Sequence, residues 1–497
     1  MQTESGPPAA DVPGGAGPVD ISGEVRQVSQ YPPTPLSWRF AIAAAMLLIA
    51  GSAYVMQPTI GTRGQALAGI LFFFGVVALF SSNLRAVNWR TIGWGFGLQL
   101  ILALLVLKGE IEIGGRLYSV RNGIQRIGEV FKAFIGFSDR GAEFVFGNLA
   151  RPGDLAHVYG KDFLFPFVFK ALPPILFVSA FFTVLYHYGI VQKCVRFMAR
   201  VMVYLMRTSG AETLSVSANV FMGQTEAPLI VKPYVPRMTN SELLTLMVSG
   251  FAHISGGMMF VYLNYGADPT AVLTTCVMAC PCSLYLAKLF LPELGMPETA
   301  GLGQTHLEKS PYVNGIDAAA AGTTDGLRLA LNVAAMLIVF IAFIAMFDAL
   351  LGLIKPALLW VGVSAGALSG WPDNLSLSQI FGWMFSPVAF LMGVEPADVE
   401  KVGSLLGSKL AINEHFAYLQ FRALKEANPE FMTLRSQVLT AFALTGFANF
   451  ASVGVQLGGI GAMAPERRQD LARLGGRALF VGFTATLLNA AVAGVLM

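Results

Sequence analysis

Long uncharged apolar runs recur along the chain and constrain its fold more than any other feature. A helix needs about 20 consecutive apolar residues to cross a bilayer, within a tolerated range of roughly 17–25. Such runs occupy approximately 40–59, 64–84, 91–107, 171–192, 243–264, 269–290, 329–354, 436–463 and 478–497. We therefore predict an all-α, polytopic membrane protein with about nine transmembrane helices.

The composition excludes the other classes of protein. Charged residues make up 13% of the chain and hydrophobic residues 55%, whereas an average soluble domain carries roughly 25% charged residues. With a mean hydropathy of +0.61, the chain lacks the polar groups to cover a water-facing surface, so we exclude soluble globular, disordered and fibrous proteins. A net charge of +3 gives no basic field for nucleic acid. Four cysteines in 497 residues make no disulfide framework.

Composition and the positions of basic residues predict the structure of the N-terminal segment and the side of the membrane on which each terminus lies. Residues 1–36 are rich in Pro, Gly and Ser, so we expect a disordered tail. No basic segment leads directly into a short apolar core, so we expect a retained N-terminal helix over 37–62 rather than a cleaved signal peptide. Basic short loops are cytoplasmic, and the basic residues of two such loops are Arg85, Arg90, Arg467, Arg468, Arg473 and Arg477. We expect a multi-pass protein of the plasma (inner) membrane with a cytoplasmic N-terminus and an external C-terminus.

Two gaps between the apolar runs are too apolar for solvated loops. The gap 193–242 holds a carboxylate within Ala218–Val231, and the gap 355–435 holds one within Leu410–Phe421. Irregular backbone at membrane depth persists only where protein buries it or a watery cavity receives it. We therefore expect two re-entrant hairpins that enter from opposite faces, each followed by two full spans. Such an inverted repeat is typical of secondary transporters, whose discontinuous helices meet near the midplane.

One further segment, Val120–Gly147, has apolar residues at helical spacing opposite charged ones. This pattern is typical of a helix that lies along the membrane surface.

The first polar cluster is Gly223–Pro228, where a glycine permits a break in the helix and a proline frees a carbonyl group. Between them, Gln224, Thr225 and Glu226 offer hydrogen-bond donors and acceptors side by side. A carboxylate at membrane depth costs about 2.5–3.5 kcal/mol, so it needs a partner or a task. The alternative interpretation is an ion pair of Glu226 with a basic residue near the interface.

Two more polar clusters lie in the second half of the chain. Asn413 and Glu414 can bind vicinal hydroxyl groups, because a carboxylate accepts two hydrogen bonds and an amide both donates and accepts. The alternative there is a solvated pair of Glu414 with Lys409. In the glycine-rich run 445–452, Phe447 can stack on a planar base, while Asn449 and Ser452 share one helix face. The alternative for this run is helix-packing contacts.

Several apparent motifs carry less weight. Gly362–Gly366 spells G-x-S-x-G, but no strand precedes it and no acidic or histidine partner is placed. Cysteines 276, 280 and 282 lie on an apolar run, where buried cysteine behaves as a small hydrophobe. Neither H-E-x-x-H nor a P-loop occurs, which excludes a zinc protease and an ATP-driven pump. An intramembrane hydrolase using Ser364 or the Glu414/His415 pair, and a channel or receptor without accumulation, remain alternatives.

These motifs together resemble those of the concentrative nucleoside transporters, over about 67–497. The most specific segments are Gly223–Pro228, the run from Gly407 through Lys409, Asn413 and Glu414 to Tyr418, and Gly446–Asn449 followed by Ser452; Phe167–Tyr188 and Gly458–Arg468 also match.

The resemblance implies a cation-coupled nucleoside symporter, not an enzyme, and this symporter assembles as a homotrimer in the lipid bilayer. Under the alternative above, the channel or receptor would bind nucleosides without accumulating them. It implies an elevator-type transport domain that moves against a trimeric scaffold. The expected division is scaffold helices with the surface helix over 63–192, transport repeat 1 over 193–292, a loop and scaffold helix over 293–356, and transport repeat 2 over 357–497. The resemblance also implies contacts to the base from Gln224, Thr225, Glu226, Met258 and Phe447, and to the ribose from Glu414, Asn449 and Ser452.

The same resemblance implies a sodium site formed by Asn219, the Met222 carbonyl, residue 253 and the Ile254 carbonyl. A small hard cation prefers oxygen ligands, yet this chain has His253 where the family has a hydroxyl residue. A second histidine, His415, stands where an aromatic residue is usual. Because histidine titrates near physiological pH, proton coupling is the alternative. The resemblance favours sodium as the coupling ion.

Overall fold

The computed structural model describes residues 33–113, 116–151, 167–170, 172–300, 311–364, 366–368, 370–372 and 374–497. Most of the expected disordered tail, residues 1–32, lies outside the described residues.

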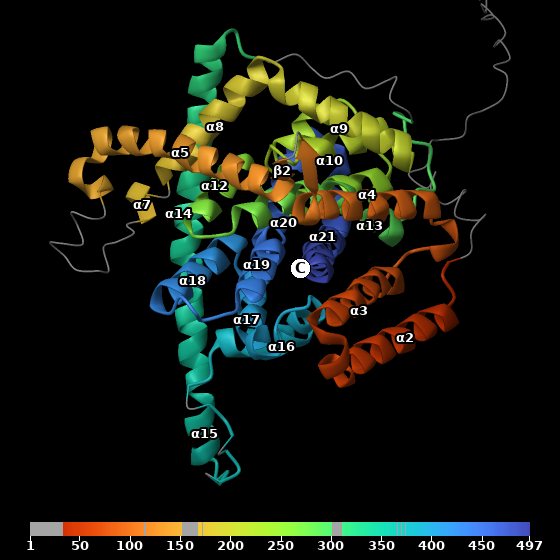
Figure 1. The fold of residues 1–497 in the computed structure, drawn as a ribbon, viewed down its shortest axis with the longest axis vertical. Coiled ribbons are helices and arrows are strands. Elements are labelled where there is room, and N and C mark those ends of the chain that lie inside the picture. The colour runs from red at the N-terminus through yellow and green to blue at the C-terminus, as the bar shows by residue number, and fades with distance from the viewer. Residues whose placement is uncertain are drawn as a thin grey trace, which may run out of the picture.

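The first part of the chain forms helices and one short hairpin (Figure 1). In chain order they are α2 (Leu36–Val55), α3 (Gln57–Leu79), η1 (Leu84–Ala86), α4 (Trp89–Lys108), β1 (Glu110–Ile113), β2 (Arg116–Ser119), α5 (Val120–Phe146), η2 (Gly147–Ala150), α7 (Phe167–Lys170) and α8 (Leu172–His187). Strands β1 and β2 pair antiparallel, Glu110 opposite Ser119. Helix α5 confirms the helix predicted over 120–147.

The order of elements in the rest of the chain repeats. The first series is α9 (Ile190–Met206), α10 (Gly210–Ala218), η4 (Ala227–Val231), η5 (Val235–Arg237), α11 (Asn240–Ala252), α12 (Gly256–Asn264) and α13 (Pro269–Phe290). Two connecting helices follow, α14 (Gly315–Gly352) and α15 (Ile354–Trp360). The second series is α16 (Leu377–Leu391), η7 (Pro396–Asp398), α17 (Val399–Ala411), α18 (Glu414–Ala427), α19 (Leu434–Leu444), α20 (Phe450–Met463), η8 (Pro465–Arg467) and α21 (Arg468–Leu496).

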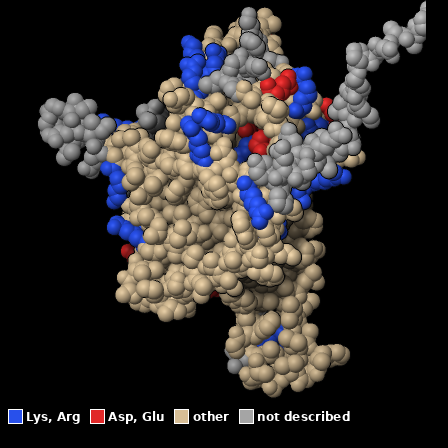
Figure 2. Space-filling view, turned by 90° about the vertical axis from the view of Figure 1, so that its right-hand side faces the viewer, with Lys and Arg blue, Asp and Glu red and all other residues tan. Residues whose placement is uncertain are grey.

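The surface of the described residues suits a lipid environment. Helix α2 exposes large apolar side chains such as Phe40, Leu47 and Tyr54, and such surface is stable only against lipid or another apolar surface. On the face in Figure 2, Lys and Arg gather over the upper part, above a wide surface that is almost free of charge. The most apolar stretches of α13 and α21 are instead mostly buried, and Figure 1 shows the long α14 running vertically along much of the molecule.

Two of the expected spans, over 243–264 and 436–463, are broken helices, each made of two shorter helices with a break between them. The first breaks at residues 253–255, between α11 and α12, and the second at residues 445–449, between α19 and α20. By length and apolarity, six helices of the described residues could cross a membrane, or seven if the bent pair α8–α9 is one span. With the bent pair counted as one span, the two broken helices account for the difference between these seven spans and the nine apolar runs.

The expected span over 171–192 is also shorter than predicted. Helix α8 ends at His187, and Gly189, with φ 77°, turns the chain before α9. The two helices meet at 74°. The gap 193–242 therefore contains most of the amphipathic helix α9, and the first hairpin begins at α10.

The two broken helices cross each other at their breaks. The Phe447 N–H donates to the His253 carbonyl oxygen (3.0 Å). Gly446 has φ 141°, and a Cβ atom there would lie 2.9 Å from the Phe251 carbonyl oxygen and 2.7 Å from Thr486 Cγ2. Only glycine adopts this backbone and permits this approach without strain.

We predict that Gly446→Ala lowers the free energy of unfolding by about 2 kcal/mol, because alanine at positive φ is strained and its methyl group clashes with the α11 backbone. The matched control is Gly454→Ala in α20, where nothing lies within 4 Å of an added Cβ. Thermal unfolding in detergent measures both variants. Equal unfolding temperatures for the two would contradict the close crossing.

Candidate functional site

Three half-helices begin at the crossing, and each begins with a side-chain cap. Ser255 accepts from the Met258 N–H at the start of α12, Asn413 from Phe416 N–H at the start of α18, and Asn449 from Ser452 N–H at the start of α20. Such caps satisfy N–H groups that a helix start leaves without partners. The positive ends of three helix dipoles therefore lie close to the breaks.

One chain of hydrogen bonds joins polar residues predicted from different parts of the sequence. The Gln224 Nε2 donates to Ser452 Oγ (3.2 Å). The Ser452 N–H donates to Asn449 Oδ1 (2.8 Å), and Asn449 Nδ2 donates to Glu414 Oε2 (2.9 Å). The structure thus brings together three places: the turn of the first hairpin that holds Gln224, the break between α17 and α18 in the second hairpin, and the start of α20.

Glu414 is buried at the first position of α18, with 4% of its surface exposed. Its second carboxylate oxygen, Oε1, accepts from the Tyr262 hydroxyl (2.9 Å). A buried carboxylate is stable where donors meet both oxygens and a helix N-terminus lies behind it. The alternative of a solvated pair with Lys409 is wrong, because Lys409 is fully buried. Its Nζ donates to the Ala443 carbonyl oxygen (2.6 Å) and to Thr486 Oγ1 (3.0 Å).

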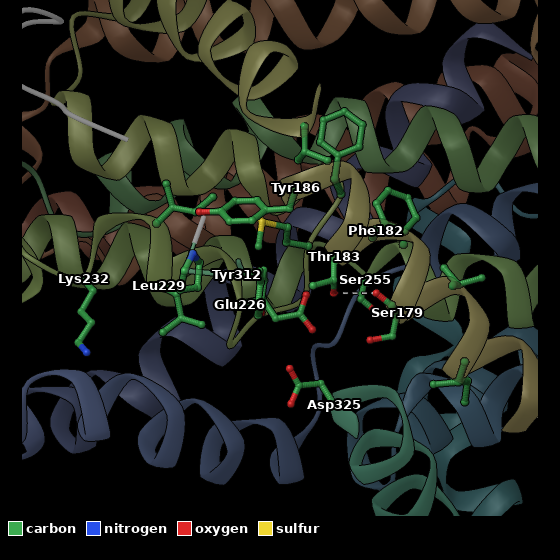
Figure 3. Close-up of a pocket in the computed structure, with 18 residues that line it drawn as sticks. Ser179, Phe182, Thr183, Tyr186, Glu226, Leu229, Lys232, Ser255, Tyr312 and Asp325 are labelled. Carbon is green, nitrogen blue, oxygen red and sulfur yellow. Dashed lines mark hydrogen bonds between the residues drawn. The ribbon is translucent and has the colours of Figure 1, made fainter. Parts of the chain in front are cut away.

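Glu226 lies apart from this chain of hydrogen bonds. Its Oε2 accepts from the Gly223 N–H (3.0 Å), and the residue lines a cavity of about 320 Å³. The cavity lies between the first hairpin, α8 and α14, and Figure 3 shows the carboxylates of Glu226 and Asp325 facing each other across it. Ser255 and Tyr312 also line it.

The remaining predicted contacts surround the two breaks. Thr225 turns its methyl group toward α20, where a Cβ on Gly459 would lie 2.8 Å from it. Met258 is buried near the start of α12, and Phe447 is half-buried beside the second break.

The residues of the predicted sodium site gather at the end of α11. Asn219 Nδ2 donates to Ser249 Oγ (2.9 Å). His253 Nδ1 lies 2.9 Å from the Ser249 carbonyl oxygen, which accepts only, so Nδ1 carries the proton. Asn219 Oδ1 is buried and has no hydrogen-bond partner among the described residues. His415 lies elsewhere, with Nε2 3.1 Å from the Tyr265 hydroxyl.

Transition-metal ligands do not cluster in the part of the chain that the structure describes, where no group of three His, Cys, Asp or Glu side chains could hold a metal ion.

The sequence analysis missed three residues of this region: Tyr262, Ser249 and Gln456. Gln456 is fully buried and donates to Gln224. A glutamine one turn after Ser452, inside an apolar run, was the signal that could have identified it. Tyr262 and Ser249 gave no such signal, since serine and tyrosine are ordinary in apolar helices.

Protein-family models and known proteins match this sequence along most of its length. Family models match residues 68–149 (Na+ dependent nucleoside transporter N-terminus), 168–268 (nucleoside recognition) and 271–494 (Na+ dependent nucleoside transporter C-terminus). Sodium/nucleoside cotransporter 1 of Mus musculus is 36% identical over 91% of this chain and 67% of its own length. An uncharacterized transporter of Haemophilus influenzae is 36% identical over 87% of this chain and 97% of its own.

Solved structures of CNTnw have the same fold. Its inward-facing, substrate-bound structure matches with a TM-score of 0.77 and 34% identity, over 87% of this chain and 97% of that one. An outward-facing structure of a CNTnw double variant matches with a TM-score of 0.78 and 33% identity, over 88% and 98%.

We predict that Tyr262→Phe lowers the free energy of unfolding by about 1–2 kcal/mol, because Glu414 loses a buried donor. Tyr204→Phe is the control, since Tyr204 is 77% exposed. Thermal unfolding in detergent without added substrate measures the effect. A loss no larger than that of the control would show that the hydroxyl does not stabilise the buried carboxylate.

Proposed function

Because the chain belongs to the family of Na+-dependent nucleoside transporters, we propose that it imports nucleosides by symport with sodium and alternating access, through a site at the crossing of its two broken helices. The hydrogen-bonded chain from Gln224 through Ser452 and Asn449 to Glu414 is the observation that supports this site most strongly. The chain is a multi-pass membrane transporter and not an enzyme.

The polar groups suit the two ends of a nucleoside. At the ribose end, Glu414, Asn449 and Ser452 offer acceptors and donors at the spacing of neighbouring hydroxyl groups. At the base end, Gln224 and Thr225 face the polar edge of the base, while Glu226 lines the neighbouring cavity and does not join the hydrogen-bonded chain. Met258 and Phe447 pack against its faces, because an aromatic ring and a thioether both suit a planar π-system.

Sodium binds, in this proposal, beside the C-terminal end of α11. The partial negative charge of a half-helix C-terminus attracts a cation. Asn219 Oδ1 has no hydrogen-bond partner among the described residues and suits a hard cation, and the carbonyl groups of Met222 and Ile254 complete the oxygen set. We propose that His253, whose Nδ1 donates to the Ser249 carbonyl, is neutral and therefore turns no positive charge toward sodium.

Alternating access follows, we propose, from an elevator movement in a homotrimer. The moving part is the two repeats, 193–292 and 357–497, and the scaffold comprises 63–192 and 293–356. The cavity beside Glu226 lies where the first repeat meets α8 and α14 of that scaffold. The N-terminus is cytoplasmic and the C-terminus external, in a plasma membrane. The hydrolase alternative has no support, since Ser364 lies in the exposed turn after α15 and accepts from the Ala367 N–H.

Uptake into proteoliposomes tests the proposed function. An inward sodium gradient should drive labelled uridine or adenosine above its equilibrium level, and an ionophore that dissipates the gradient should abolish the accumulation. No accumulation of any nucleoside would contradict the proposal, and accumulation driven by a proton gradient alone would contradict sodium coupling.

We predict that Glu414→Gln raises the KM for nucleoside at least about tenfold, because hydrogen bonds to a charged group contribute about 1.5–3 kcal/mol. Because glutamine has nearly the same shape, the variant should still fold. Initial uptake rates at a series of uridine concentrations measure the change, and Glu430→Gln, on the exposed loop after α18, is the control. An unchanged KM would remove Glu414 from the ribose site.

We predict that Asn219→Ala raises the sodium concentration for half-maximal uptake about tenfold, because it removes an oxygen ligand worth roughly 1–2 kcal/mol. The KM for nucleoside at saturating sodium should change little. Asn428→Ala, at the exposed end of α18, is the control. A sodium titration that coincides with the control would place the ion elsewhere.

A further inference from the structure

The buried amide of Gln456 has no part in the site described so far. Gln456 lies on α20, one turn after Ser452, and has no exposed surface. Its Nε2 lies 3.1 Å from Gln224 Oε1 and 3.1 Å from the Met247 carbonyl oxygen. A buried amide with two such partners has one orientation, because the rotated amide would leave acceptors facing acceptors.

The backbone carbonyl of Met247 determines which way round the side-chain amides of Gln456 and Gln224 are oriented. A carbonyl oxygen only accepts, so the Gln456 atom that faces it must be the NH2 group. The same NH2 group faces Gln224, so the Gln224 atom in that contact must be its carbonyl oxygen. The Nε2 of Gln224 is therefore on the opposite side, where it donates to Ser452 Oγ (3.2 Å).

Gly250 on α11 makes room for the two amides. A Cβ there would lie 2.6 Å from Gln456 Nε2 and 3.0 Å from Gln224 Cβ. The contact between the two glutamines thus depends on the absence of a side chain at this position, which ties the amide pair to the backbone of α11.

We propose that Gln456 is a positioning residue that holds Gln224 as a hydrogen-bond donor toward the base, so that the transporter prefers nucleosides with a keto group over those with an amino group at the contacted edge. This inference rests on the proposed function, which places the base against Gln224. With its carbonyl oxygen turned toward Gln456, Gln224 presents its NH2 group, a donor, on the opposite side. A keto oxygen completes that pair, whereas an amino group meets a second donor.

Two pairs of nucleosides isolate this difference. Uridine and cytidine differ by an oxygen or an amino group at position 4 of the base, and inosine and adenosine differ in the same way at position 6. The ratio of kcat/KM within each pair reports the orientation of the Gln224 amide. A general loss of stability lowers uptake of both members and leaves the ratio unchanged.

The first experiment compares these ratios in proteoliposomes for the wild type and Gln456→Leu. The wild type should favour the keto member of each pair by about tenfold. Gln456→Leu should bring the ratio toward one, because the Gln224 amide becomes free to rotate and meet either group. Gln437→Leu is the matched control: Gln437 on α19 likewise donates to a backbone carbonyl, that of Met432 (2.9 Å), and its loss should leave the ratio unchanged.

The second experiment replaces Gln224 with glutamate, which accepts at both oxygens. Gln224→Glu should reverse the preference in favour of cytidine and adenosine while Gln456 is present. This variant decides the question if Gln456→Leu does not fold.

A wild type that does not discriminate within either pair would overturn the inference, and so would a ratio that survives Gln456→Leu or Gln224→Glu. Absence of uptake of every nucleoside by the wild type is a different result, since it rejects the proposed function itself and this inference with it.

Discussion

The hydrogen bond between the Phe447 N–H and the His253 carbonyl is the contact on which the rest of this structure depends. A helix broken at membrane depth exposes backbone groups that lipid cannot satisfy. Here two broken helices satisfy one another, because the break of each lies against the break of the other. The close approach requires a residue without a side chain, and Gly446 is that residue.

The polar site is a consequence of these breaks. Helix starts need caps, and the caps Asn449 and Ser255 bring polar side chains to the crossing. Helix ends need donors or cations, and the buried side-chain nitrogen of Lys409 donates to a carbonyl at the end of α19. Groups that satisfy the backbone thus stand beside Glu414, which the resemblance assigns to the ribose. Under the proposed function, Asn449 both caps α20 and contacts the ribose.

The sequence predicted the polar clusters better than it predicted the helices. Gln224, Glu414, Asn449 and Ser452 stood out as polar residues inside apolar stretches, and the resemblance assigned them to the substrate. The positions of the breaks within two of the spans were not predicted, because hydropathy is the same for a broken helix and an intact one. The capping residue Asn449 and its preceding glycine marked the second break, but a cap signal inside an apolar run is ambiguous.

Other features depend on tertiary packing that no local pattern encodes. The separate cavity that Glu226 lines is formed with α8 and α14, which lie outside the first hairpin in the sequence. The partnership of Gln456 with Gln224 joins residues 232 positions apart. The end of α8 at His187 depends on Gly189, which is one glycine among 53 in the chain.

A structure determined with a nucleoside and sodium bound tests the central claim most directly. The account predicts a nucleoside at the crossing of the two broken helices, with its ribose hydroxyl groups bonded to Glu414 and Asn449 and its base beside Gln224. A nucleoside seated instead between α8 and α14 beside Asp325, without contact to Glu414, would contradict it.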